Sequence, residues 1–212
     1  MYAPDHFKEN DVPTMQAAIH GAGIATLVTV NSNRPQANHV PMLLVAQEGA
    51  YGTLYGHVAR ANPLSTDTTS GSALAIFLGP ESYISPSWYP TKADTGKVVP
   101  TWNYVAVHAT GPITFFDDRE RLLDLVNNLT ERHERVRKSP WAVSDAPSDY
   151  IDSALRAIVG FRLSITTLEG KWKMSQNRIK RDQQGVVSGL KAEGAEVVAN
   201  IMKSVTEKNN LR

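Results

Sequence analysis

The sequence contains no cysteine, and this absence excludes several kinds of chemistry at once. Without thiols there can be no disulfide framework, no thiolate metal site and no cysteine nucleophile. The six histidines occur without a His-Glu-x-x-His pattern or any clustered spacing, so we expect no metal site. A chain without cysteine suits a reducing compartment, and a cytoplasmic location is therefore the expectation.

Long apolar runs and an excess of charge of one sign are also missing. No segment approaches the roughly 18 apolar residues of a membrane span, and residues 1–8 lack a basic region followed by an apolar run. The 22 basic and 21 acidic residues give a net charge of +1, which provides little general attraction for a polyanion. We expect no membrane partner, and DNA binding would need charge gathered on one face or on a dimer.

Several motifs of nucleotide-binding and hydrolytic enzymes are absent as well. There is no Gly-x-Ser-x-Gly elbow, no Walker phosphate loop and no Gly-x-Gly-x-x-Gly fingerprint. The serine hydrolase, P-loop and Rossmann classes therefore lack their usual evidence. No pair of carboxylates stands out either, so any chemistry is expected to come from a bound cofactor.

What is present is the composition and pattern of a globular, mainly β protein. The chain is 42% hydrophobic and 20% charged, and no linker divides its 212 residues, so a single domain over 1–212 is expected. Strands are predicted at 24–30, 37–45, 51–57, 73–78, 102–116 and 159–167, and helices at 13–21, 117–136, 148–157 and in a C-terminal tail from about 182. Residues 81–90 are predicted as a loop. Sequential antiparallel strands with tight turns favour a barrel with peripheral helices.

Three segments place polar side chains beside apolar or aromatic ones. Trp102, Asn103, Tyr104 and His108 lie in a stretch that otherwise predicts a buried strand. Segment 57–63 ends a strand before a candidate helix, a place where a guanidinium and free backbone N–H groups can bind phosphate. Segment 171–178 surrounds a tryptophan with lysine, amide and arginine donors. Together the three segments predict a pocket for a flat aromatic ligand that carries an anionic tail.

Each segment also has a plainer interpretation. Arg60 and Asn62 are equally consistent with a surface arginine and a turn asparagine before a proline. The 171–178 segment is consistent with a solvated basic loop whose Trp172 packs on the core. The aromatic residues Tyr83, Trp88, Tyr89 and Trp102 are able to stack on a ligand, pack a dimer interface or fill the core.

Longer motifs carry a family resemblance that extends from Met1 to about Lys203. They are Asn38-His-Val-Pro41, Gly56-His-Val-Ala-Arg-Ala-Asn-Pro63, Gly79-Pro-Glu-Ser-Tyr-Ile-Ser-Pro-Ser-Trp-Tyr89, Val99-Pro-Thr-Trp-Asn-Tyr104 and Lys173-Met-Ser-Gln-Asn-Arg178. In these motifs the chain resembles the PaiB-like family of FMN-binding negative transcriptional regulators. That family has a flavin-reductase-like split barrel and is related in fold to pyridoxamine-phosphate oxidases.

The resemblance implies an FMN-binding split β-barrel, antiparallel and Greek-key-like, that forms a homodimer with FMN near the subunit interface. It implies four groups of cofactor contacts. His39, Val40 and Pro41 would border the isoalloxazine; His57, Arg60 and Asn62 would approach the ribityl phosphate; Trp102, Asn103 and Tyr104 would line the site; and Lys173, Gln176 and Arg178 would close it.

The resemblance also implies repression of transcription, with DNA as a candidate partner. The sequence offers no helix-turn-helix, and its most basic run, Arg132–Lys138, is interrupted by an acidic residue and is more typical of a solvated helix face. A dimer would present two copies of that run, or of the Lys180–Arg181 pair, to the phosphate backbone of DNA. The alternative is an FMN-dependent oxidoreductase acting on a small molecule, for which no catalytic residue is identified.

Overall fold

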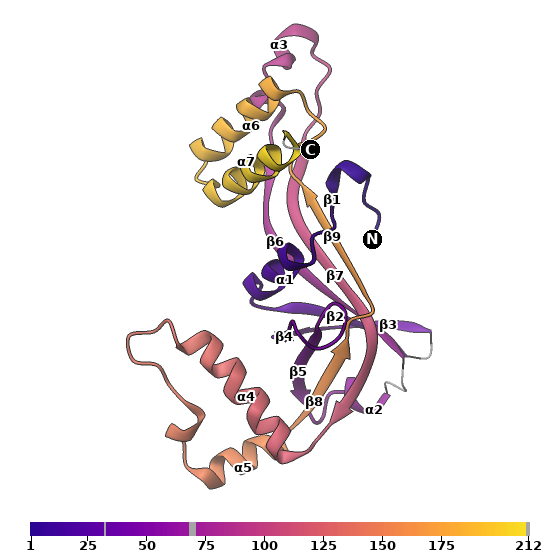
Figure 1. Cartoon of the computed structure of the whole chain (residues 1–212), viewed down its shortest axis with the longest axis vertical. Coiled ribbons are helices and arrows are strands. Elements are labelled where there is room, and N and C mark those ends of the chain that lie inside the picture. Colours follow the sequence, from indigo (N-terminus) through magenta and orange to yellow (C-terminus); the bar gives the residue numbers. More distant parts are fainter. Residues whose placement is uncertain (32, 68–70, 211–212) are drawn as a thin grey trace. The chain divides into compact units, whose positions relative to one another are not determined.

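A computed structural model describes residues 1–31, 33–67 and 71–210, which form a mainly antiparallel sheet with peripheral helices (Figure 1). The predicted fold class is thereby confirmed. The strands are β1 (Lys8–Glu9), β2 (Ala25–Asn31), β3 (Arg34–Val40), β4 (Leu43–Val45), β5 (Thr53–Ala59), β6 (Ser72–Ile84), β7 (Thr101–Phe116), β8 (Ile158–Ser164) and β9 (Thr167–Lys173). The helices are α1 (Val12–Gly21), α2 (Leu64–Asp67), α3 (Thr91–Thr95), α4 (Arg119–Glu134), α5 (Ser148–Arg156), α6 (Lys180–Ala192) and α7 (Glu196–Asn210), with short 3-10 turns at Asp5–Phe7, Pro86–Trp88 and Val143–Asp145.

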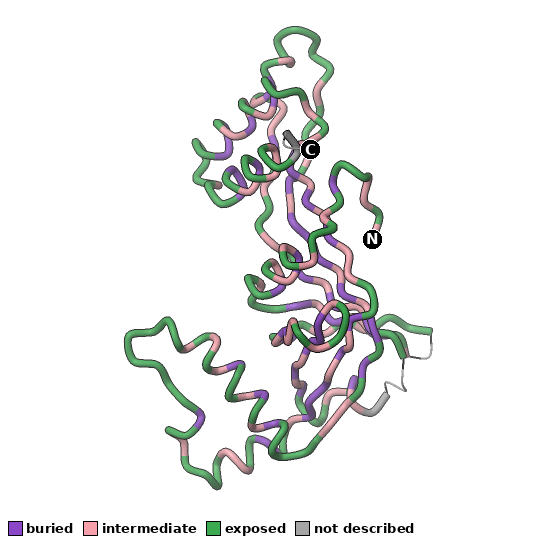
Figure 2. Tube along the Cα trace, viewed as in Figure 1, coloured by how far each residue is buried: buried purple, intermediate pink, exposed green. Residues whose placement is uncertain are grey.

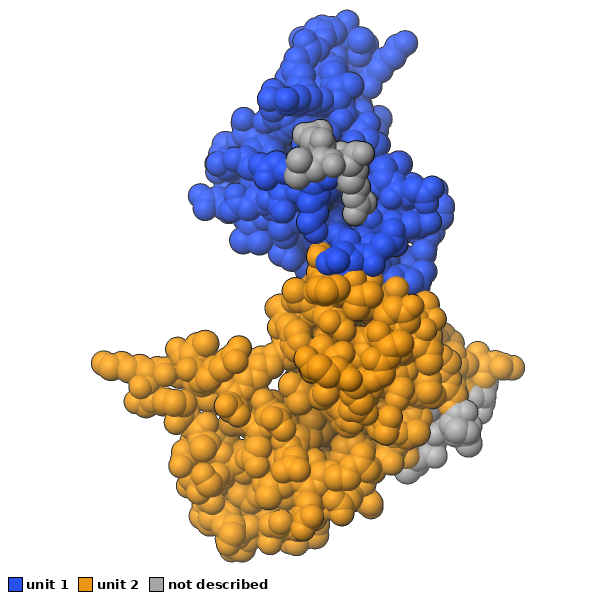
Figure 3. Space-filling model, in the orientation of Figure 1, with its two compact units in different colours: residues 1–11, 78–107, 169–212 blue, residues 12–77, 108–168 orange. Residues whose placement is uncertain are grey.

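The contacts divide the chain into two compact units, shown in Figure 3. Unit 1 comprises Met1–Asp11, Leu78–Val107 and Glu169–Arg212, and unit 2 comprises Val12–Phe77 and His108–Leu168. The long strands β6 and β7 each contribute residues to both units. A single domain over 1–212 stays a prediction.

Unit 2 is built on a sheet in the order β3-β2-β6-β7-β8-β5-β4. The strands predicted at 24–30 and 37–45 form a hairpin, in which β2 pairs with β3 from Ala25↔Val40 to Asn31↔Arg34. Alternate residues of β2 are buried, which is the period of a strand with one face on a core. The predicted 37–45 strand breaks into β3 and β4 at Pro41, a residue that has no N–H to donate to a sheet.

The buried positions of unit 2 lie along its strands and on one side of α4 (Figure 2). Leu27, Leu54 and Phe161 are fully buried side chains of three different strands. The helix predicted at 117–136 is confirmed as α4, and it buries Leu122, Leu125 and Leu129. The three- and four-residue spacing of these leucines gives one apolar stripe on the helix.

Unit 1 contains the paired strands β1 and β9, with β9 also pairing with β7, and a helical hairpin, α6–α7. The predicted helical tail is confirmed, although it begins at Lys180. Gly194, between the two helices, has φ of +77°, a left-handed conformation that glycine adopts without steric cost. Met174, Leu190 and Met202 are fully buried.

Three segments of unit 1 differ from the sequence predictions. Residues 81–84 continue β6 instead of starting a loop, 91–95 form α3, and 167–173 form strand β9. In β9 the charged residues lie on one face, and Gly170 and Trp172 are buried on the other. The residues still alternate between the two faces as in any strand, but a glycine on the buried face makes the hydrophobic alternation hard to recognise in the sequence. Among the described residues, no helix combines the length and the apolar character needed to cross a membrane.

Candidate functional site

Arg60 follows β5 and is held by backbone carbonyls of the α5–β8 connection. Its Nε donates to the Arg156 carbonyl at 2.8 Å, and its Nη2 donates to the Ile158 carbonyl at 3.1 Å. Nη1 lies 3.5 Å from Asp117 Oδ2, a long contact between half-exposed groups. These bonds fix the plane of the guanidinium, yet they leave part of its five N–H donors unused.

Asn62 connects the end of β3 to the loop after β5. Its Nδ2 donates to Asn38 Oδ1 at 2.8 Å, and its Oδ1 accepts from the Leu64 backbone N–H at 2.9 Å, at the start of α2. The adjacent His39 is exposed, with Nδ1 3.1 Å from Thr26 Oγ1. The structure thus brings Asn62 beside the 38–41 segment, in which Val40 is buried and Pro41 is exposed.

His57 is a half-buried histidine of β5 with an unsatisfied polar atom. Its Nδ1 is buried and has no hydrogen-bond partner among the described residues. Burial lowers the pKa of His57 below the usual histidine value, so the ring is neutral at pH 7. A buried polar atom without a partner costs stability unless something else satisfies it, and a bound ligand with a hydrogen-bonding group would do so.

In unit 1, β6, β7 and β9 present an aromatic and basic face, formed by Tyr83, Trp102, Tyr104, Lys171 and Lys173. Lys173 Nζ donates to Thr101 Oγ1 and to the Trp102 carbonyl, both at 2.5 Å. Lys171 Nζ lies 5.3 Å from the centroid of Tyr104, and the rings of Tyr83 and Trp102 meet edge-to-face at 6.0 Å.

This aromatic–basic face combines cations with accessible ring surface. Trp102 is 51% exposed and Tyr83 is 46% exposed. Burial, with Lys171 and Arg178 nearby, lowers the pKa of Lys173. Such a face has the chemistry to hold a planar, electron-rich or anionic group.

Asn103 and Gln176 are engaged inside unit 1. Asn103 is fully buried; its Oδ1 accepts from Ser175 Oγ at 3.0 Å. Gln176 accepts from the Met174 N–H at 2.6 Å and donates to the Trp172 carbonyl at 2.5 Å. These bonds hold the connection from β9 to α6, where Ser175 has a positive φ of 60°. Gln176 therefore holds backbone and Asn103 holds the Ser175 side chain, and cofactor contact by either stays a prediction.

Arg178 and Trp172 have clear packing roles. The guanidinium carbon of Arg178 lies 4.7 Å from the ring centroid of Tyr89, a cation–π arrangement. Trp172 is 8% exposed and faces the core, as the plainer interpretation of its segment expected, while Lys171 and Lys173 alternate with it on β9.

The predicted residues divide between the two units. Unit 2 holds His39, Val40, Pro41, His57, Arg60 and Asn62, and unit 1 holds Trp102, Asn103, Tyr104, Lys173, Gln176 and Arg178. Sequence reasoning missed Asn38 as the partner of Asn62 and Lys171 as the partner of Tyr104. The role of Lys171 was detectable from the sequence, because Lys171 and Lys173 are two residues apart and such residues lie on the same face of a strand.

Three of the six arginines and lysines considered for DNA have other contacts. Arg132 donates to the carbonyls of Met42 at 2.8 Å, Ala22 at 3.1 Å, and His20. Arg137 pairs with Glu134 at 2.9 Å, and Arg181 pairs with Asp94. Within the part of the chain that the structure describes, the exposed cations that keep no ion pair in these two regions are Arg135, Lys138 and Lys180.

The family comparison gives one match, over residues 1–167, to the family described as "Putative FMN-binding domain". The matched residues end before helices α6 and α7, and also before Lys173, Gln176 and Arg178. The match covers all six predicted residues of unit 2 as well as the three on β7.

Two relatives match over nearly the whole length of both chains. An uncharacterized protein of Aspergillus fumigatus is 34% identical over 258 aligned residues, which cover 100% of this chain and 99% of the relative. The protease synthase and sporulation protein PAI 2 of Bacillus subtilis is 30% identical over 212 residues, which cover 98% of this chain and 99% of the relative.

Two solved structures share the fold at low sequence identity. The FAD and heme binding protein of Mycobacterium smegmatis has a TM-score of 0.59 and 14% identity, over 78% of this chain and 73% of that one. The flavocytochrome Anf3 of Azotobacter vinelandii has a TM-score of 0.58 and 14% identity, over 86% and 78%. At this identity the likeness shows the fold.

Proposed function

The chain belongs to this family of FMN-binding domains, with a split β-barrel fold and FMN as cofactor, and from this premise we propose that it is a negative transcriptional regulator of the PaiB type. The observation that carries the proposal is the similarity to PAI 2, which extends over 98% of this chain and 99% of the relative. The protein would act as a homodimer that binds DNA.

The residues of unit 2 fit the polar part of FMN. A phosphate group carries between about −1.5 and −2 charges at neutral pH and accepts several hydrogen bonds. Arg60 retains unused N–H donors, and Asn62 and Asn38 add amide groups beside it. The unsatisfied Nδ1 of His57 is the observation that most directly calls for a ligand. These residues would bind and orient the ribityl phosphate chain.

Taken by itself, the aromatic–basic face of unit 1 has stacking surface for a planar ring. Trp102, Tyr104 and Tyr83 offer ring surface, and Lys173 places a positive charge beside it. When bound, the flavin would supply reversible electron transfer. In a regulator, the protein residues would convert the presence or redox state of the flavin into a change in DNA affinity.

The DNA contacts would come from exposed cations on a dimer. Arg135 and Lys138 follow α4 in unit 2, and Lys180 begins α6 in unit 1. Each is exposed and without an ion pair among the described residues. Contacts of this kind to phosphate provide affinity that depends strongly on salt but little on sequence.

A second function, an FMN-dependent oxidoreductase acting on a small molecule, is favoured by the same aromatic–basic face. Trp102 and Tyr83 remain about half exposed, so a planar substrate would find stacking surface there. In that case Lys173 and Lys171 would bind and orient the substrate.

One pair of assays separates the two functions. The FMN-loaded protein is mixed with a DNA fragment from upstream of its own coding sequence at about 0.15 M salt, near the ionic strength of cells, with a scrambled fragment of equal length as control. A regulator shifts the first fragment selectively. Rapid flavin reduction by NADH or NADPH, followed by reoxidation by a small molecule and without any DNA shift, would instead identify an oxidoreductase.

A further inference from the structure

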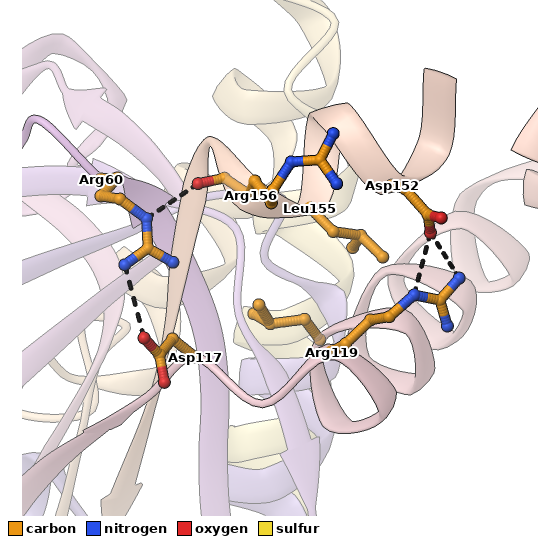
Figure 4. Close-up of a pocket in the computed structure, with 7 residues that line it drawn as sticks. Arg60, Asp117, Arg119, Asp152, Leu155 and Arg156 are labelled. Carbon is orange, nitrogen blue, oxygen red and sulfur yellow. Dashed lines mark hydrogen bonds and ion pairs between the residues drawn. The ribbon is translucent and has the colours of Figure 1, made fainter. Parts of the chain in front are cut away.

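The long helix α4 borders more than one hollow of unit 2. The hollow at its first turn (Figure 4) includes Arg60 and therefore belongs with the residues proposed for the flavin phosphate. A second hollow lies between α4 and the strands β4 and β5, and none of the residues that line it is a predicted flavin contact. Its volume is about 240 Å³. Pockets for drug-sized ligands measure roughly 300–1,000 Å³, so the occupant of this hollow would be a smaller molecule.

The walls of the second hollow are largely apolar. Leu43 and Val45 of β4 and Phe116 at the end of β7 are half-buried, and Leu125 of α4 is buried. An apolar group that entered the hollow would leave water, which favours binding. The walls therefore suit a ligand with an apolar body.

One carboxylate at this hollow is already engaged by the protein. Tyr55 Oη donates to both carboxylate oxygens of Glu48, at 3.0 Å and 2.7 Å. Arg162 Nη2 lies 3.4 Å from Oε1 of the same carboxylate. Because Arg162 balances the charge of Glu48, the charges open to a ligand are those of α4.

Arg121 and Asp124 of α4 carry opposite charges, and both line the hollow. The guanidinium carbon of Arg121 lies 4.1 Å from the ring centroid of Phe116, a cation–π contact that holds the side chain over the ring. Neither the guanidinium of Arg121 nor the carboxylate of Asp124 makes a hydrogen bond or an ion pair with any residue that the structure describes. Both groups are thus available to a ligand.

The spacing of these two charges limits the kind of ligand. Residues three apart on a helix are neighbours, with Cβ atoms about 5–6 Å apart, so one small molecule is able to reach both. A cation bound at Asp124 would be repelled by Arg121, and an anion bound at Arg121 would be repelled by Asp124. A zwitterion whose ammonium and carboxylate groups share one carbon atom would satisfy both residues at once.

We infer that this hollow binds a free α-amino acid with an apolar side chain. Arg121 would donate to the carboxylate of the amino acid, and Asp124 would accept from its ammonium group. The side chain of the amino acid would contact Leu43, Val45 and Phe116. The inference rests on the hollow and its charges and does not depend on the regulator proposal; in a regulator, the amino acid would act as an effector.

The test is a calorimetric titration of the purified protein with L-leucine, once without FMN and once with FMN at saturation. Two analogues with the same apolar chain are titrated beside it: isocaproate, which lacks the ammonium group, and isoamylamine, which lacks the carboxylate. The variants are Asp124→Asn and Arg121→Gln. The control is Glu120→Gln, which removes a carboxylate from the same helix at an exposed residue that does not line the hollow.

We expect one L-leucine per chain in both titrations, and at least roughly fivefold weaker binding of each analogue, because each leaves one charged residue without a partner. Asp124→Asn should bind L-leucine no more tightly than isocaproate, and Arg121→Gln should bind it no more tightly than isoamylamine. The control should change the affinity for L-leucine by less than about twofold.

Three results would overturn the inference: no saturable binding of L-leucine, an analogue that binds as tightly as L-leucine, or wild-type affinity for L-leucine in both variants. It would also fail if FMN abolished the binding of L-leucine, because the hollow would then be part of the flavin site. None of these results depends on whether the protein shifts DNA.

Discussion

At the scale of single residues, Arg60 has one observed role and one proposed role. It ties the loop after β5 to two carbonyls of the α5–β8 connection, and in the proposed cofactor site its unused donors would bind the phosphate of FMN. A lysine keeps the charge but cannot reproduce the planar, two-carbonyl contact. Substitutions at this position therefore separate charge from geometry.

We predict that Arg60→Ala weakens FMN binding by at least roughly tenfold and lowers the free energy of unfolding by about 1–3 kcal/mol, because both roles are lost. Arg60→Lys should recover part of the FMN affinity but less of the stability. Flavin fluorescence titration and urea unfolding measure the two effects separately. Unchanged FMN affinity in Arg60→Ala would remove Arg60 from the phosphate role.

His57 gives a pH-dependent contribution to stability. Its pKa in the folded protein lies below the usual 6.5, since burial disfavours the charged ring. The unfolded chain therefore binds more protons below about pH 6.5, and the free energy of unfolding falls as the pH drops from there towards the folded pKa. Above this window the contribution is constant.

We predict that His57→Gln reduces the loss of stability between about pH 7.5 and pH 5, because the variant has no imidazole to protonate at this position. Urea unfolding of wild type and variant at several pH values tests this. His20, whose pKa burial and Arg132 also lower, is present in both proteins, so part of the pH dependence should remain. Identical pH profiles would contradict the assignment.

At the scale of elements, the strands with regular hydrophobic alternation and the helices with a leucine stripe were predictable from the sequence. The hairpin β2–β3, the long strand β7 and the helices α1, α4 and α5 lie close to where the pattern placed them. Strand β9 was missed because its exposed face is charged and its buried face includes Gly170. Its pairing with β1 and β7 is a tertiary contact that no local pattern encodes.

The candidate site was predictable only in part. The sequence identified hydrogen-bond donors such as Asn103 and Gln176, but it did not show in which direction their side chains point. Asn103 faces the buried side of β7 because side chains alternate along a strand, and Tyr104 and Trp102 consequently face the other side. The bonds of Arg132 to three carbonyls were also invisible, since those carbonyls lie far away in the sequence.

Helix α6 packs closely on the 3-10 turn Pro86–Trp88 because it has glycine at 185 and 189. A Cβ on Gly185 would lie 2.0 Å from the Trp88 carbonyl oxygen, and one on Gly189 would lie 2.3 Å from the Trp88 ring. The first contact involves backbone, so the turn itself would have to move.

We predict that Gly185→Ala destabilises the protein by about 1–3 kcal/mol, since overpacking exceeds the gain of about 1 kcal/mol in helix propensity. Gly21→Ala is the control: this glycine ends α1, and a Cβ there meets no described atom within 4 Å. The control should be neutral or slightly stabilising in thermal or urea unfolding. Equal stability of the two variants would show that the turn yields easily.

At the scale of the whole molecule, the proposed regulator would bind DNA with an affinity that falls as the salt concentration rises. Each phosphate contact contributes about −0.9 to the slope of log K against log salt. Two exposed cations per chain, Arg135 and Lys138, would give four contacts in the proposed homodimer.

We predict that the double variant Arg135→Gln, Lys138→Gln makes this slope less steep by roughly 3 to 4. The same measurement on Lys203→Gln, an exposed cation of α7, serves as the control and should leave the slope unchanged. DNA-shift titrations between about 50 and 200 mM salt span a suitable range. A slope unaltered by the double variant would place the DNA surface elsewhere.

The most direct test of the whole account is the visible spectrum of the purified protein after FMN has been added and the excess removed. The account predicts flavin absorption bands at about one FMN per chain, with quenched flavin fluorescence, because the donors of unit 2 fit the ribityl phosphate of the cofactor. A protein that retains no flavin and leaves FMN fluorescence unchanged would contradict the account and leave only the split-barrel fold standing.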